Sequence, residues 1–341
     1  MNKHLHLKLT SAEIGSLWTT YMTESSVIPV LSYFQQTVED SEIKDIVSKT
    51  LTKSKEHVKT LTELFKLEKH PVPQGFSMED VNLAAPRLFS DTYMLIFIRN
   101  LGKAGIAAHG MALSMSARKD VRDLFFLYLK EAADIEDQAK EVMLSKGVFI
   151  RPPYIDSPSE VTFVEKQSFL RGWLGERRTL TGAEIAHIFL NYSNNTGGKA
   201  LLLGFAQTAQ SEELRNHFIR GIDIARTIIT KLRTLLEEST LSAPMTWDTE
   251  ITNSTVAPFS DKLMLFHVSS LNAIGIGNIG GSLALSLRKD IAAKYFIILK
   301  EIGLYAEDSA NLLIKNGWFE RPPQAIDREQ LSKGKKGSEE D

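Results

Sequence analysis

The chain has 341 residues, of which 43% are hydrophobic and 24% charged, a composition typical of a globular protein and too apolar for a disordered one. Its 40 basic and 42 acidic side chains give a net charge of −2, which argues against a nucleic-acid-binding protein, because such proteins carry a basic face. There are no cysteines, so disulfides, thiolate catalysis and cysteine-ligated metal clusters are excluded. At roughly 100–200 residues per domain, this length predicts two domains.

The N-terminal residues 1–14 (MNKHLHLKLTSAEI) contain no apolar stretch of signal-peptide length and no small-residue cleavage site. Secretion by that route is therefore not expected. We expect the protein to be cytoplasmic.

The sequence contains an internal repeat. The hexapeptide LTSAEI returns as LTGAEI after 171 residues, and two tripeptides, Phe-Ser-Asp and Arg-Lys-Asp, return after 170 residues. The copies begin at Leu9 and Leu180, at Phe89 and Phe259, and at Arg118 and Arg288. Matches that follow one another in order over the whole half-length indicate a tandem duplication in which one residue was lost between the first motif and the second.

Within each half the apolar residues recur with the period of a helix, and no run alternates as a strand would. In the first half, start and stop signals predict four helices. They run from Thr10–Ser11 to about Val38, from Asp40–Ser41 to about Leu67, from Ser90–Asp91 onward, and from Lys119–Asp120 to Gly147. A long connection with Pro and Gly, residues 70–86, separates the second helix from the third, which predicts a four-helix bundle with one crossover.

The second half repeats this scheme, with residues 242–258 as its crossover. The sequence thus predicts an all-α chain of two tandem four-helix bundles with long crossover loops, packed together through the central linker. The predicted units are residues 1–157 (first bundle), 158–178 (linker, with a short helix around 163–173), 179–325 (second bundle) and 326–341 (a disordered charged tail).

Several short motifs in combination resemble those of a known family. They are PVPQGF at residues 71–76, PRLFSD at 86–91, Ser-x-Arg-x-Asp at 116–120 and the closing Arg-Pro-Pro at 151–153. Together they are similar to an uncharacterised duplicated family of endospore-forming bacteria that is related to spore coat protein F-like proteins. The resemblance implies a ferritin-like fold and a link to sporulation, and it supplies no reaction and no catalytic residues.

A ferritin-like bundle raises the question of a metal site. Di-iron enzymes of this fold place a Glu on two helices and a Glu-x-x-His motif on the other two. This chain has one such motif, Glu184 to His187, and it lies in the first turn of a predicted helix. We interpret it as a chance occurrence and expect His187 to be solvated.

Four potential metal ligands lie on the inward stripes of the first half: Glu24, His57, His109 and Glu136. Two imidazoles and two carboxylates could bind zinc, iron or manganese. Counted from the predicted turns, Glu24, His57 and Glu136 lie at one depth, and His109 lies about 10 Å away from Glu136 at the helical rise.

Buried ionisable groups are more often paired for structural reasons, and Arg99 lies near the inferred depth of Glu136. The corresponding positions of the second half cannot form such a site, because they are Asn195, Ile228, Ile279 and Ala306. We therefore favour the structural interpretation and expect no stoichiometric transition metal or other cofactor. If a relic site exists, it belongs to the first bundle.

Residues 264–287 contain no Asp, Glu, Lys or Arg and are long enough to cross a membrane. Their counterpart in the first half carries Arg99, Lys103 and His109, so we favour a buried helix and expect no transmembrane segment. Close approach of a neighbouring helix is expected at Gly102, Gly105, Gly275 and Gly281. Alternatively, this glycine face could form a contact between the bundles or within a dimer.

Three functions remain open. The leading hypothesis is a non-enzymatic structural or interaction protein associated with the forespore or spore coat, whose partners are other proteins or further copies of itself. The second is a metal-binding or oxidant-handling protein that uses Glu24, His57 and Glu136. The third is a carrier of a small apolar ligand in a bundle core.

Overall fold

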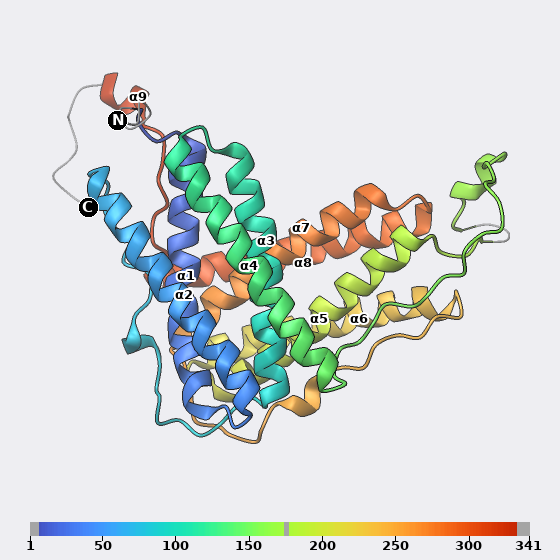
Figure 1. Cartoon of the computed structure of the whole chain (residues 1–341), viewed down its shortest axis with the longest axis horizontal. Helices are drawn as coiled ribbons and strands as arrows, with labels where there is room; N and C mark the ends of the chain where they lie inside the picture. Colours follow the sequence, from blue (N-terminus) through green and yellow to red (C-terminus); the bar gives the residue numbers. More distant parts are fainter. Residues whose placement is uncertain (1–6, 174–176, 333–341) are drawn as a thin grey trace.

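The computed structural model describes residues 7–173 and 177–332, and this part of the chain folds into two tandem helical bundles (Figure 1). The duplicated all-α fold predicted from the sequence is confirmed. The helices of the first half are α1 (Ser11–Thr37), α2 (Ser41–Leu67), α3 (Asp91–Met115) and α4 (Lys119–Ser145). Those of the second half are α5 (Gly182–Thr208), α6 (Glu212–Glu237), α7 (Asp261–Leu285) and α8 (Lys289–Lys315).

The repeated hexapeptide forms the start of the first helix in each half. The Thr10 hydroxyl accepts the N–H of Glu13, and the Glu13 carboxylate accepts the N–H of Thr10, which satisfies two backbone donors at the helix N-terminus. Thr181 and Glu184 repeat this capping box at the start of α5. The motif therefore fixes where both bundles begin.

The turn between the first two helices of each half is held by the start of the third. The Asp91 carboxylate accepts the N–H groups of Glu39 and Asp40, at 3.2 and 2.8 Å. This places the start of α3 beside the start of α2, so the two helices run parallel and residues 68–90 cross the length of the bundle. Within the crossover lies the short 3-10 helix η1 (Met78–Asp80), and η3 (Asp248–Glu250) takes its place in the second half.

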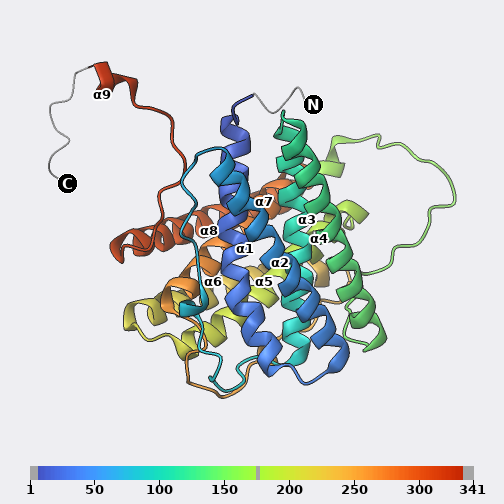
Figure 2. The same cartoon turned by 60° about the vertical axis from the view of Figure 1, so that its left-hand side comes forward.

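The two crossover loops pair with each other and join the halves (Figures 1 and 2). Their antiparallel bridges are Val81 with Phe259 and Phe89 with Ile251. Four backbone hydrogen bonds of 2.8–2.9 Å support them, and each has a counterpart with the halves exchanged: Asn82 to Pro258, Thr252 to Leu88, Ser90 to Glu250 and Ser260 to Asp80. The halves are thus related as in a twofold dimer, in which one surface meets its own copy.

Aromatic side chains from both halves pack around this junction. The Tyr33 ring meets Phe259 edge-on, with centroids 5.3 Å apart, and Phe34 meets Phe89 at 5.9 Å. One cluster of buried apolar residues extends from α1 and α2 through both loops into α5 and α7. A smaller second cluster fills the far end of the second bundle.

The central linker does not hold the bundles together, so that prediction was wrong. Residues 154–168 are exposed, with Val161 and Phe163 each 87% exposed, and Figure 2 shows this segment passing outside the helices. The physical reason is that the loops and α1, α3, α5 and α7 already supply a buried interface. Within the linker the helix is shorter than predicted, a 3-10 turn η2 (Gln167–Leu170). The start of the predicted disordered tail contains the short helix α9 (Arg328–Ser332), and the rest of that tail, residues 333–341, lies outside the described residues.

Among the described residues, α7 is the one helix that is long and apolar enough to cross a membrane by length and composition. Its first half is buried in the core through Leu263, Met264, Leu265 and Val268. Its second half is partly open, with Ile274 40% and Leu285 54% exposed. The expectation of a buried helix therefore holds for the first half of α7, whereas in the second half one face is buried, at Ile279 and Ser282, and the other is open.

The predicted close approach at glycine occurs in the first bundle. A Cβ on Gly102 would lie 2.9 Å from the backbone nitrogen of Glu136, and one on Gly105 would lie 2.8 Å from the Cβ of Ala132. In the second bundle, a Cβ on Gly275 would meet Ile302 at an ordinary 3.9 Å, and one on Gly281 would meet nothing within 4 Å. The prediction was therefore wrong for α7, which packs less closely against α8.

Two glycines of the same helix test this packing. Gly102→Ala should lower the free energy of unfolding by about 1–3 kcal/mol, because the added methyl group meets the α4 backbone. Gly110→Ala is the matched control: it meets no atom within 4 Å and should raise stability by up to about 1 kcal/mol through helix propensity. Urea denaturation measures both, and stabilisation by both substitutions would contradict the close α3–α4 contact.

Candidate functional site

The first bundle contains a row of charged groups in its interior. His57 of α2 lies between two carboxylates: its Nδ1 is 3.0 Å from Oε1 of Glu24 in α1, and its Nε2 is 2.7 Å from Oε2 of Glu131 in α4. Lys53, one turn earlier in α2, places its Nζ 3.0 Å from the other Glu131 oxygen. When His57 is protonated, the row therefore holds two negatively charged carboxylates and two positively charged groups.

The pKa values favour this charged form. Burial alone would lower the pKa of His57 and raise that of Glu24, because it penalises charge. The hydrogen bond and the opposite charges outweigh burial, so the pKa of His57 is raised above 6.5 and the pKa of Glu24 is held below 4.5. The side chains are only 8% and 15% exposed, so water screens the pair weakly.

A second histidine lies beyond the row. The Tyr128 ring covers that of His57, with centroids 3.8 Å apart, and His109 of α3 meets Tyr128 at 5.6 Å. The Nδ1 of His109 is buried and has no hydrogen-bond partner among the described residues. Burial lowers the pKa of His109, which keeps its ring neutral near neutral pH.

Of the predicted ligands Glu24, His57 and Glu136, the structure brings the first two together and leaves the third apart. Glu136 accepts bonds from Arg99 Nε at 3.1 Å and from Lys140 Nζ at 2.6 Å, as the structural interpretation expected for Arg99. The predicted depths were wrong because they were counted from two turns at opposite ends of the bundle. Counted from one end, His109 is level with His57, and Glu136 is not.

Glu131 takes the place that was predicted for Glu136. Sequence reasoning missed it because it lies beside the apolar stripe of α4 rather than on it. One signal could have found it: Lys130 and Glu131 recur as Lys300 and Glu301 in the second half. There Glu301 bonds Lys231 at 3.1 Å, near the bundle surface.

The first-bundle groups do not converge on one point. His57 presents its two ring nitrogens to different carboxylates, so one ion could not bind His57, Glu24 and Glu131 together. Within residues 7–173 and 177–332, no three His, Asp or Glu side chains are placed to hold a metal ion. In the row each carboxylate lies beside a basic side chain, so the opposite charges neutralise one another.

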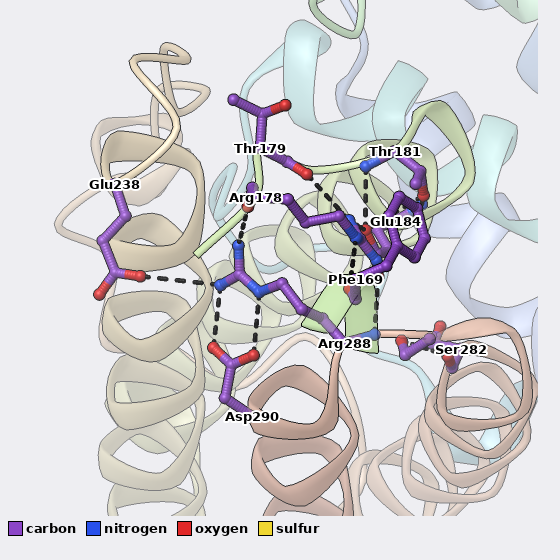
Figure 3. A network of polar contacts seen from close by, with 10 residues as sticks. Phe169, Arg178, Thr179, Thr181, Glu184, Glu238, Ser282, Arg288 and Asp290 are labelled. Carbon is purple, nitrogen blue, oxygen red and sulfur yellow. Dashed lines mark hydrogen bonds and ion pairs between the residues drawn. The ribbon is translucent and has the colours of Figure 1, made fainter. Parts of the chain in front are cut away.

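The recurring Arg-Lys-Asp motif builds a second buried network, at the end of each bundle. In the second half, Arg288 donates from Nε and from one terminal nitrogen to Asp290, at 2.9 Å each, and from the other to the carbonyl of Arg178 (Figure 3). Its backbone N–H donates to Glu184 at 3.0 Å, and Glu184 also accepts two bonds from the Arg178 guanidinium. This ties the start of α5 to the turn between α7 and α8.

The single Glu-x-x-His string belongs to this structural network. Glu184 is fully engaged in capping and in bonds to Arg178 and Arg288, which leaves it no free oxygen for a metal. His187 is not simply solvated as expected: its Nδ1 lies 3.1 Å from the Ser282 hydroxyl of α7. Its pairing with α7 explains why a histidine near a helix start faces inward.

The first half repeats the network with its own residues. Arg118 bonds Asp120 with both ends of its guanidinium fork and Glu68 with a third nitrogen, at 2.7–3.1 Å. Glu13 accepts the N–H groups of Ala117 and Arg118, as Glu184 accepts that of Arg288. The Ser-x-Arg-x-Asp motif of residues 116–120, one of those that carry the family resemblance, therefore holds helix ends together.

The charged row predicts coupled effects on stability. His57→Ile leaves Glu24 buried without its base, so the free energy of unfolding should fall by about 3 kcal/mol. Adding Glu24→Asn reproduces the pair that the second half carries, Asn195 and Ile228, and should restore at least about 1 kcal/mol. Urea denaturation of the two single variants and the double variant measures the coupling.

The same variants predict a pH dependence. Because its pKa is raised, His57 contributes stability that is fully present below pH 6.5 and declines as the pH rises through the raised value. The wild type should therefore lose more stability between pH 6 and pH 9 than His57→Ile does. Additive substitutions and equal pH slopes would contradict a charged His57.

A prediction in acid concerns Glu184. Burial alone would raise its pKa, but Arg178 and the N–H groups of Thr181 and Arg288 lower it to about 2. Its contribution to stability is thus present above pH 4.5 and lost as the pH falls toward 2. The stability difference between wild type and Glu184→Gln should shrink over that range, and Glu141→Gln, which removes an exposed carboxylate, is the control. A constant difference for Glu184→Gln would contradict the lowered pKa.

Comparisons with known proteins follow the internal repeat. The family model described as "Protein of unknown function (DUF3231)" matches residues 3–161 and again residues 168–331. No curated protein matches the chain. Among solved structures, one named "putative spore coat protein" from Bacillus halodurans C-125 is similar at 19% identity and a TM-score of 0.40, over 44% of this chain and 98% of that chain.

Proposed function

The chain belongs to the DUF3231 family, in two tandem copies, and we propose that it is a structural or interaction protein of sporulation without enzymatic activity. The observation that carries this proposal is what the two copies have kept. Both retain the helix-end networks around Arg118 and Arg288 and the reciprocal loop pairing. The groups capable of chemistry differ between the copies, since His57 corresponds to Ile228.

A pair of exposed apolar residues supports a role in binding other proteins. Phe126 and Leu127 of α4 are 62% and 48% exposed, and their counterparts Phe296 and Ile297 of α8 are 64% and 50% exposed. A largely exposed aromatic side chain gains little for folding, so its presence at the same place in both copies supports contact with another protein chain.

Sporulation enters the proposal through the motifs of residues 71–76, 86–91 and 116–120, which resemble those of an endospore-former family. A forespore or spore-coat location is proposed on the same ground. The ferritin-like arrangement is also part of the proposal. It is supported by the parallel course of α2 and α3, joined by a crossover along the bundle, as in ferritin-like connectivity.

Metal binding by the first bundle is the second candidate. Its support is the buried Nδ1 of His109, which has no partner among the described residues, close to the pair of Glu24 and His57. Against it stands the engagement of both His57 nitrogens by carboxylates. A carrier role has less support, because the groove of about 680 Å³ in this structure lies at the junction of the bundles rather than in a bundle core.

Localisation tests the proposal. A fluorescent fusion expressed from its own promoter during sporulation should become enriched in the forespore or coat. The double variant Phe126→Ser with Phe296→Ser should reduce that enrichment at least severalfold while the melting temperature stays within a few degrees. Ile219→Ser is the matched control, since Ile219 is 45% exposed but corresponds to Ser48 in the first half, and it should leave enrichment unchanged.

Two outcomes contradict the proposal. A diffuse signal in vegetative cells with no spore enrichment would remove the link to sporulation. One transition-metal ion per purified chain by elemental analysis, lost on Glu24→Ala, would favour the metal-binding candidate instead.

A further inference from the structure

A surface groove of about 680 Å³ lies where the two crossover loops meet the start of α7. Its lining includes Asp261, Gln210, Ala257, Trp318 and Phe76. The comparable corner of the first half is occupied by one of the chain's own side chains. That difference indicates what kind of group the groove accepts.

In the first half, Arg87 fills the corner. Its guanidinium donates to the Asp91 carboxylate at 2.6 Å, lies 2.8 Å from the Glu39 carboxylate, and donates from Nε to the carbonyl of Phe89 at 2.9 Å. Two acids and a carbonyl thus surround one planar cation, the geometry that suits a guanidinium. Asp91 at the same time holds the turn between α1 and α2.

In the second half the counterparts of the Asp91 carboxylate and the Phe89 carbonyl remain, and alanine replaces the arginine. Asp261 corresponds to Asp91, and it accepts the N–H groups of Gln210 and Ser211 at 3.1 and 2.9 Å, as Asp91 does in its own turn. Phe259 corresponds to Phe89 in the reciprocal loop pairing, so its carbonyl takes the same place. Ala257 stands at the position that corresponds to Arg87. No basic side chain of the described residues forms an ion pair with Asp261, whereas Arg87 pairs with Asp91.

We propose that this groove is a binding site for a guanidinium group presented by another molecule, which would sit where Arg87 sits in the first half. Charge supports this assignment, because Glu79, Asp80 and Asp261 line the groove against one base, Lys262. That base already has partners in the groove lining: its Nζ donates to the carbonyl of Gly75 at 3.1 Å and lies over the Phe76 ring. The net field in the groove therefore favours a cation.

Access from solvent also fits an external ligand. The Arg87 side chain is 24% exposed in its filled corner, so a guanidinium in the equivalent position would be largely enclosed and still reachable from solvent. Gln210 replaces Glu39, which removes one of the two acids and makes the site weaker than its filled counterpart. Exchangeable binding of an arginine side chain or a small guanidine compound follows.

Titration of the full-length protein tests this proposal. The probes are N-ethylguanidinium and the peptide acetyl-Gly-Gly-Arg-Gly-Gly-amide, and the same peptide with citrulline in place of arginine is the uncharged control. We expect saturable shifts of the Gln210 and Ser211 amide resonances with the arginine peptide, and at least tenfold weaker binding of the citrulline peptide. Tighter binding of the peptide than of ethylguanidinium would identify a polypeptide as the source of the group, and equal binding a small guanidine compound.

Variants make the test specific. Ala257→Arg should fill the groove as Arg87 does and weaken peptide binding at least tenfold, and Val256→Arg, which adds the same charge at an exposed neighbour outside the groove, should change it less than twofold. Asp261→Asn keeps an acceptor for the turn but removes the charge, and should also weaken binding tenfold. Melting temperatures establish that each variant is folded. No saturable binding by the wild type, or unchanged binding in Ala257→Arg and Asp261→Asn, overturns the proposal.

Discussion

The reciprocal pairing of the two crossover loops is the interaction on which the rest of this structure depends. Each loop would otherwise carry backbone donors and acceptors into a buried junction without partners, at a substantial cost in free energy. By bonding to each other, the loops satisfy these groups and place Phe89 and Phe259 in a core shared by both halves. The orientation of the bundles, and the groove beside α7, follow from that pairing.

The two halves differ mainly in their bundle interiors and less at the junction between them. Residues that hold the junction or the helix ends recur, as with Asp91 and Asp261, while the interior of each bundle has changed its chemistry. The first bundle neutralises a buried row of charges around His57, whereas Ile228 stands at that position in the second. Buried pairs of this kind contribute little net stability but penalise the loss of one partner, which is consistent with the joint replacement of Glu24 and His57 by Asn195 and Ile228, whereas Glu131 recurs as Glu301.

Much of the fold could be predicted from the sequence, because helix period, caps and the repeat are local signals. The failures concern relations between distant segments. Glu136 was grouped with His57 because sequence spacing does not show at which end of a bundle each turn lies, and Glu131 was missed because it flanks the apolar stripe. The loop pairing was not predicted either, since residues 80–90 and 250–260 have no periodicity and their partners lie about 170 residues away.

The exposed linker has a consequence for how this molecule would behave once cut. Residues 154–168 lie outside the core, while the apolar cluster and the paired crossover loops join one half to the other. A protease that reaches the linker would therefore sever the chain without separating its bundles. Non-covalent contacts hold the two halves together, and the peptide linker ensures that each molecule contains one copy of each half.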